Sequence, residues 1–301
     1  MQATSSDGLA PLPSGWWLPR YWLMWLSWPV MRGVALIPFK SRVRLGSLLG
    51  GALYRLMPKR RAIARLNIGA CFPHLDQAGR ESLLERHFEA VGIALMEMPS
   101  AWWSPPARLG PLRSINGIEH LDTALAQGRG AILASAHFLS MDPGLRHFSQ
   151  DRYLCAVYRP NNNAVFDYMI NRARAGHDGE MIDRADVRKI VRVLKSNTPV
   201  WYPPDQDHGP RHSVFVPFFG IPSATLTATT RLVKLSGASV VPCYFHRLPD
   251  MAGYEIVLLP PLKNFPGASE VEDAHRMSAL LEEQIKRSPE QYLWLHRRFK
   301  T

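Results

Sequence analysis

Short apolar runs alternate with helix-like patterns through the last two thirds of the chain. Six apolar runs are typical of buried strands, at 131–135, 153–158, 199–202, 213–216, 239–245 and 254–259. Four intervening segments carry apolar residues at helical spacing, at 165–175, 186–195, 225–235 and 269–286. Strands that alternate with helices predict an α/β fold, with a mainly parallel sheet flanked by helices on both faces.

The first third of the chain has a different pattern. From Tyr21 to Phe39, 19 residues are mostly apolar and rich in tryptophan, which is nearly enough to cross a bilayer and is also typical of a segment at headgroup level. We therefore expect residues 1–40 to contain an N-terminal membrane-anchor helix that spans the membrane or lies in its interface; a helix buried in the core is the alternative. Residues 41–301 are predicted to form one domain, with a helical first part at 41–110.

The charge of the chain indicates an anionic partner. The formal net charge is +11 and the pI is about 9.9, which suits an acidic protein, an anionic membrane surface or a nucleic acid. No basic-aromatic recognition motif for nucleic acid is present, and basic residues cluster directly after the apolar segment. That clustering places the body of the protein on the cytoplasmic side of the membrane. Cys71, Cys155 and Cys243 are far apart, which predicts neither a disulfide framework nor a zinc site.

A histidine and an aspartate follow the run at 131–135 at a spacing of five residues. His137 is expected at the carboxyl end of a strand, where α/β folds keep their active sites, and Asp142 at the start of a helix. An imidazole oriented by a carboxylate can take a proton from a hydroxyl group. We therefore predict His137 as a general base with Asp142 as its orienting residue, against the alternative of a helix-capping aspartate beside a structural histidine.

Two further polar segments follow apolar strands. Arg159 comes directly after the run at 153–158, and a guanidinium there can bind a phosphate or carboxylate. The loop at 203–213 carries Asp205, Asp207 and Arg211, which could form an Asp–Arg pair that shapes a pocket or holds a phosphate. A metal site formed with the two histidines of this loop is disfavoured, because its Gly-Pro step prevents a regular helix from presenting both imidazoles.

These segments together resemble a known family. The His-x4-Asp motif, Tyr-Arg-Pro-Asn at 158–161, the loop at 205–220 and the run Gln291-Tyr-Leu-Trp-Leu-His-Arg-Arg-Phe-Lys300 are similar to the bacterial lipid A late acyltransferases. Those are lauroyl and myristoyl transferases of the lysophospholipid acyltransferase superfamily. The sequence has no Gly-x-Ser-x-Gly elbow, Walker loop or Gly-x-Gly-x-x-Gly, which argues against a serine hydrolase, a P-loop NTPase and a dinucleotide enzyme.

The resemblance implies a glycerol-3-phosphate acyltransferase-like fold and a specific reaction. A fatty acyl chain would pass from acyl carrier protein to a hydroxyl of an anionic lipid A precursor, at the cytoplasmic face of the bacterial inner membrane. For this reaction we expect no cofactor, no metal and no covalent enzyme intermediate. The resemblance also implies that Arg159 contacts an acceptor phosphate or stabilises the pocket, supported by Asp205, Asp207 and Arg211.

Alternative functions remain open at this point. Aspartate at position 142 is the residue that phospholipid acyltransferases carry, whereas many late acyltransferases have glutamate. A phospholipid or another glycolipid is therefore a second candidate acceptor, and a thioesterase would use water instead. A non-catalytic protein that binds the membrane surface would also fit the charge and the apolar segment.

Overall fold

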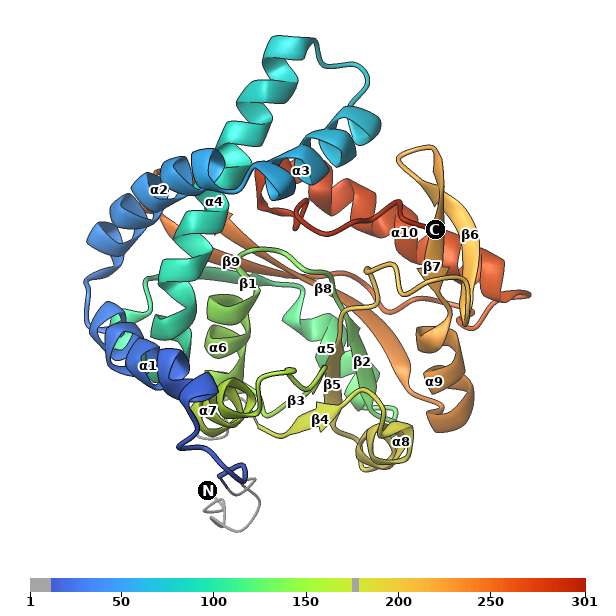
Figure 1. Ribbon diagram of the computed structural model, residues 1–301. Coiled ribbons are helices and arrows are strands. Elements are labelled where there is room, and N and C mark those ends of the chain that lie inside the picture. Colours follow the sequence, from blue (N-terminus) through green and yellow to red (C-terminus); the bar gives the residue numbers. More distant parts are fainter. Residues whose placement is uncertain (1–11, 175–178) are drawn as a thin grey trace.

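The computed structural model describes residues 12–174 and 179–301, and a seven-stranded sheet lies at its centre (Figure 1). The strand order is β1-β9-β8-β2-β5-β3-β4, and β8–β9 is the antiparallel pair among otherwise parallel neighbours. The strands are β1 Leu112–Asn116, β2 Ala131–Ala134, β3 Cys155–Tyr158, β4 Met181–Asp183, β5 Pro199–Tyr202, β8 Ser239–Leu248 and β9 Gly253–Leu258. The predicted mainly parallel sheet is confirmed, with β1 and β4 as strands that the sequence pattern did not indicate.

Helices cover both faces of this sheet, as predicted. They are α5 Ile118–Leu125, α6 Met141–Asp151, α7 Ala164–Arg174, α8 Val187–Lys195 and α9 Ala228–Ser236. Adjacent residues of β2 point to opposite faces, so Leu133 packs in one core with α5 and α6, and Ile132 packs in a second core with α8 and α9. The helix predicted at 165–175 is α7; Ala175 lies outside the described residues.

A two-stranded hairpin lies beside the main sheet. Strands β6 Ser213–Phe218 and β7 Ile221–Leu226 pair antiparallel and pack against α10, Glu270–Arg287. The strand predicted at 213–216 is therefore present, but it lies in this hairpin and not in the main sheet. The helix expected from residue 225 begins later, at Ala228, because residues 221–226 continue as β7. All three cysteines are buried and free, which agrees with the absence of a disulfide framework.

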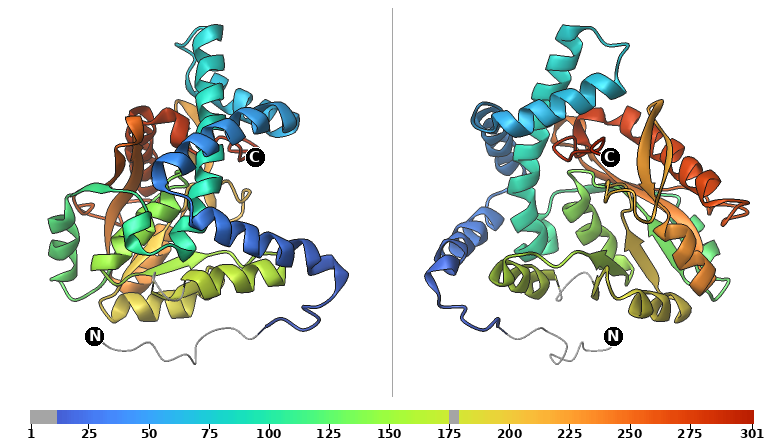
Figure 2. Two further views of the ribbon diagram at one scale, coloured as in Figure 1. Left: turned by 90° about the vertical axis from the view of Figure 1, so that its left-hand side faces the viewer. Right: turned by 45° about the vertical axis from the view of Figure 1, so that its right-hand side comes forward.

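Four helices precede the sheet: α1 Trp22–Ala35, α2 Phe39–Leu56, α3 Pro58–Cys71 and α4 Gln77–Trp103. Figures 1 and 2 show α2 crossing the long helix α4. The two backbones approach closely where Gly46 and Gly50 face Gly92, and a Cβ added to Gly92 would lie 2.2 Å from the carbonyl oxygen of Gly46. A side chain at this crossing would push the helices apart, so glycine is required there.

A membrane-spanning anchor is not found. Within residues 12–174 and 179–301, no helix is both long enough and apolar enough to cross a membrane. Helix α1 has 14 residues, and at 1.5 Å per residue it is about 21 Å long, short of the roughly 30 Å hydrocarbon core. The helix in the apolar segment ends at Ala35, and α2 begins separately after Pro38, at the last residue of that segment.

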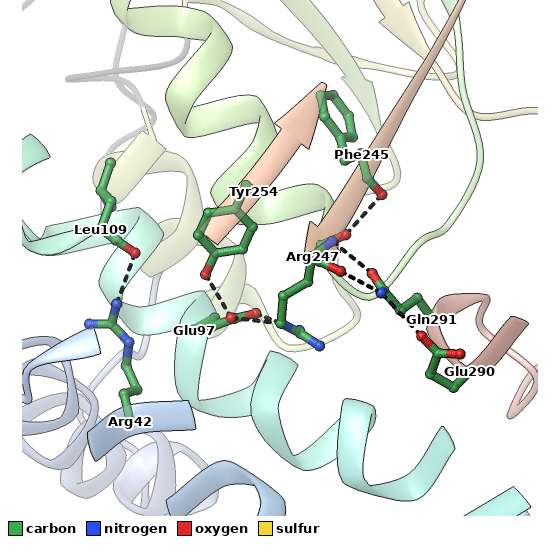
Figure 3. Close-up of polar contacts among 9 residues, drawn as sticks. Arg42, Glu97, Leu109, Phe245, Arg247, Tyr254, Glu290 and Gln291 are labelled. Carbon is green, nitrogen blue, oxygen red and sulfur yellow. Dashed lines mark hydrogen bonds and ion pairs between the residues drawn. The ribbon is translucent and has the colours of Figure 1, made fainter. Parts of the chain in front are cut away.

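A buried polar network joins α4 to the edge of the sheet (Figure 3). Glu97 of α4 forms an ion pair with Arg247 of β8 at 2.6 Å, and the Tyr254 hydroxyl donates to the same carboxylate at 2.6 Å. Arg42 of α2 is also fully buried and donates to the carbonyl oxygen of Leu109 at 3.0 Å. The Glu97 contacts fix α4 against β8 and β9, and Arg42 ties α2 to the segment before β1, since buried charged groups are tolerated only when their polar atoms are satisfied.

Candidate active site

Two residues at the carboxyl ends of adjacent strands form a hydrogen-bonded pair. His137 follows β2, and Asp205 follows β5, its neighbour in the sheet. The Nδ1 atom of His137 lies 2.5 Å from Oδ1 of Asp205, and the backbone N–H of His137 donates to Oδ2 at 3.0 Å. Both carboxylate oxygens therefore hold the histidine, one through its ring and one through its backbone.

This arrangement prepares His137 to act as a base. An ionised carboxylate only accepts hydrogen bonds, so Nδ1 carries the proton and Nε2 is the basic atom of the neutral ring. No described residue forms a hydrogen bond with Nε2, and the side chain is 21% exposed, so Nε2 has no protein partner and the ring is not closed off from solvent. Burial opposes a charge on the ring, but Asp205 outweighs burial and raises the pKa of His137 above its ordinary value. The same pairing lowers the pKa of Asp205, despite its burial.

The C-terminal segment braces this histidine. The backbone N–H of Leu139 donates to the carbonyl oxygen of Gln291 at 2.8 Å, and Leu293 donates to the carbonyl oxygen of His137 at 3.1 Å. Asn67 of α3 holds the segment from the other side through the carbonyl oxygens of Trp294 and His296. Residues from α3, β2 and the end of the sequence therefore meet at the site.

Asp142 does not orient His137 in this structure. It lies in the first turn of α6, forms an ion pair with Arg174 of α7, and accepts a hydrogen bond from the Trp102 indole at 3.1 Å. The helix begins at Met141 and directs the carboxylate toward α4 and α7, while Nδ1 of His137 is occupied by Asp205. The predicted His137–Asp142 pair is therefore replaced by His137–Asp205.

The other predicted site residues lie in the loops that follow β3 and β5. Arg159 is exposed at the end of β3, the strand next to β5. Asp207 is almost fully buried and accepts hydrogen bonds from the Gly209 amide at 2.7 Å and the Thr301 hydroxyl at 2.9 Å. Arg211 is exposed in the loop before β6. Asp207 thus shapes its own loop and holds the C-terminal segment, in place of the Asp–Arg pair that the sequence suggested.

Several basic side chains near the site were given no individual role from the sequence. Burial lowers the pKa of His208, and Arg184, Lys300 and His296 lower it further by charge repulsion. Burial also lowers the pKa of His296, although Asp205 opposes that effect. His208, His296 and Lys300 lie in segments that the sequence analysis quoted, whereas Arg184 lies outside all of them. The edge of the sheet is therefore positively charged beyond His137 itself.

The fold and the pair define an α/β protein with an accessible base at the carboxyl edge of its sheet, and comparison with known proteins gives the family. The family model described as bacterial lipid A biosynthesis acyltransferase matches residues 16–301. The lipid A biosynthesis lauroyltransferase of Escherichia coli (strain K12) is 40% identical over 284 residues, covering 94% of this chain and 93% of the relative. The lipid A biosynthesis myristoyltransferase of the same organism is 32% identical over 291 residues, covering 94% and 88%.

The chain therefore belongs to the bacterial lipid A biosynthesis acyltransferase family, and the protein is an acyltransferase acting in lipid A biosynthesis. This confirms the resemblance carried by the motifs and removes the non-catalytic alternative. The crystal structure of a 1-acyl-sn-glycerophosphate acyltransferase from Thermotoga maritima matches with a TM-score of 0.39 and 14% identity, covering 83% of this chain and 98% of that one. That similarity is too low to carry an argument about the site.

Proposed function

We propose that the protein transfers a fatty acyl chain from a thioester on acyl carrier protein to a hydroxyl of a lipid A precursor, with His137 as general base. The observation that carries this proposal is the pair in which Asp205 holds Nδ1 of His137 and leaves Nε2 without a partner among the described residues. A base that must activate a hydroxyl needs this tautomer and this orientation.

The proposed reaction is a direct transfer without a covalent enzyme intermediate. Nε2 of His137 accepts the proton of the acceptor hydroxyl while its oxygen attacks the thioester carbonyl carbon. The tetrahedral intermediate then collapses, the carbon–sulfur bond breaks, and the imidazolium gives its proton to the thiolate. Asp205 stabilises the imidazolium between these steps, and the enzyme returns to its starting state.

Asp142 has a positioning role in this proposal. Its contacts with Arg174 and Trp102 join α6 to α7 and α4. Helix α6 begins four residues after His137, so fixing its first turn fixes the loop that carries the base. Arg159, exposed at the same edge of the sheet, is proposed to bind a phosphate of the acceptor, because a guanidinium matches the geometry of phosphate oxygens.

We further propose that the enzyme works at the cytoplasmic face of the bacterial inner membrane, held there by an interfacial surface. Helices α1 and α2 expose large apolar side chains between basic ones: Trp22, Leu23, Leu26, Val30, Leu45 and Leu48. This combination of tryptophan, leucine and arginine is typical of helices that lie in the headgroup region of an anionic leaflet.

Replacing Leu23 and Leu26 by serine should abolish flotation of the protein with anionic vesicles. Undiminished flotation of this variant would contradict the proposed interfacial surface.

The reaction is tested by acyl transfer from labelled acyl carrier protein to a tetra-acylated lipid A precursor, with lysophospholipid offered in parallel. Wild-type protein should acylate the precursor, and His137→Ala should lose on the order of 10²–10⁴ in rate. Transfer to lysophospholipid alone would replace the proposed acceptor. Near-wild-type turnover of a correctly folded His137→Ala protein would remove the base from the mechanism.

A further inference from the structure

Helix α8 carries a stripe of basic side chains that no described contact explains. Arg188, Arg192 and Lys195 are spaced at i, i+4 and i+7, which places them on one face of the helix, and all three are exposed. The opposite face is apolar and buried through Ile190 and Leu194. We refer to Arg188, Arg192 and Lys195, together with the exposed Arg184 just before the helix, as the cationic stripe.

The acidic groups near this stripe are already engaged elsewhere. Glu180 pairs with Lys189, on a different side of the helix, at 2.5 Å. Asp186 caps the helix by accepting from the Lys189 amide at 2.9 Å, and Asp183 accepts from the Ala185 amide at 2.9 Å. Among the residues that the structure describes, none forms an ion pair with a member of the cationic stripe. Four positive charges therefore face solvent together.

The stripe starts at the edge of the sheet that carries His137. Arg184 comes directly after β4, and its backbone N–H donates to the carbonyl oxygen of Tyr158 at the end of β3. In the sheet, β4 lies three strands from β2, which is about 14 Å at the usual strand spacing. Arg184 is close enough to His208 to lower its pKa. Helix α8 then runs back toward the amino end of β5, so the Arg184 end of the stripe is the part nearest to His137. A macromolecule bound along the stripe would therefore lie beside the sheet and not over His137.

The chemistry of the stripe favours an acidic protein over a membrane. An interfacial helix needs apolar side chains among its charges. On α8 the one large apolar residue that is exposed is Val187, at the amino end of the helix. In Figures 1 and 2, α8 also lies on the other side of the molecule from α1 and α2. Resting on the proposed function, which supplies the thioester donor, we propose that the cationic stripe docks the acidic carrier protein and directs its acylated pantetheine arm to His137.

Charge reversal tests this docking surface. We compare an Arg188→Glu/Arg192→Glu variant with an Arg86→Glu/Lys263→Glu control, which has the same change in charge at exposed positions of α4 and of the loop before α10. The stripe variant should raise KM for the carrier-bound donor about ten-fold with kcat unchanged, because reversing a peripheral charge chiefly slows association. Transfer from acyl-pantetheine, which lacks the acidic protein, should be the same in wild type and both variants, and it also reports correct folding.

The outcomes separate this inference from the function on which it rests. A wild-type enzyme that uses carrier-bound chains, with a stripe variant that keeps its KM, would overturn the docking surface alone. A wild-type enzyme that takes acyl-pantetheine and ignores the carrier protein would overturn both the donor and the surface. If the stripe variant loses flotation with anionic vesicles while its KM for the carrier-bound donor is unchanged, α8 binds lipid and the proposal is wrong.

Discussion

Asp205 and Asp142 are two carboxylates that could each serve His137, and the structure treats them differently. Asp142 is five residues away in the sequence, yet it bonds to Arg174 and Trp102. Asp205 is 68 residues away, and it bonds to both the ring and the backbone of His137. In a parallel sheet the groups that follow adjacent strands meet at one edge, so the strand order decides which carboxylate orients the base.

The largest expected difference between the two carboxylates is in turnover. Asp205→Asn should lower kcat by about 10²–10⁴-fold, because the amide can hold the ring in the wrong tautomer and cannot stabilise the imidazolium. Asp142→Asn should retain more activity than Asp205→Asn. Steady-state kinetics on both purified variants measure this, with circular dichroism to confirm that each is folded. An equal loss of kcat in the two variants would contradict the different roles given to Asp205 and Asp142.

A second difference is expected in stability. Asp142 and Arg174 form a mostly buried pair, with side chains 13% and 16% exposed, and it joins two helices. Removing either partner should lower the free energy of unfolding by about 1–3 kcal/mol, as for a buried charged hydrogen bond left unpaired. A double-mutant cycle with Asp142→Ala and Arg174→Ala, measured by urea unfolding, should show that the two losses are not additive. Additive losses would mean that Asp142 does not act through Arg174.

The smallest expected effect is a change in pH dependence. His137 must be neutral to accept a proton, and Asp205 raises its pKa above the ordinary 6.5 although burial opposes this. The acid limb of kcat/KM should therefore lie above pH 6.5 in the wild type. In Asp205→Asn the carboxylate no longer raises the pKa of His137, while burial still lowers it. The acid limb of the residual activity should therefore move to lower pH. In Asp142→Asn the acid limb of the pH profile should stay where it is in the wild type. A shift in that variant would mean that Asp142 does influence His137.

Patterns along the sequence predicted the parts of the fold that depend on neighbours in the chain. Continuous apolar runs identified β2, β3, β5, β8 and β9, because strands buried on both faces have few polar residues. Strand β4 has only three residues and is too short to give that signal. Strand β1 mixes polar and apolar residues and so does not stand out as an apolar run. His137 was placed correctly at the end of a strand for the same local reason.

The partner of His137 could not be read from spacing, because it depends on the order of strands in the sheet. Asp205 was selected as a pocket residue from the polar crowding of its loop, but nothing in the sequence stated that β5 lies beside β2. The length of the apolar N-terminal segment likewise suggested a span, whereas its helix α1 ends at Ala35 and has only 14 residues. Long-range arrangement overrode the local pattern in both cases.

The contact between His137 and the segment at 291–296 has a consequence for how the enzyme matures. The base is synthesised near the middle of the chain, while the backbone groups that brace it follow about half a chain later. A nascent chain can therefore form β2 and α6 before the brace exists, as domains fold during synthesis. We therefore expect acyl transfer to begin only once the segment at 291–296 has docked against His137, so that incomplete chains on the ribosome would not consume acyl thioesters.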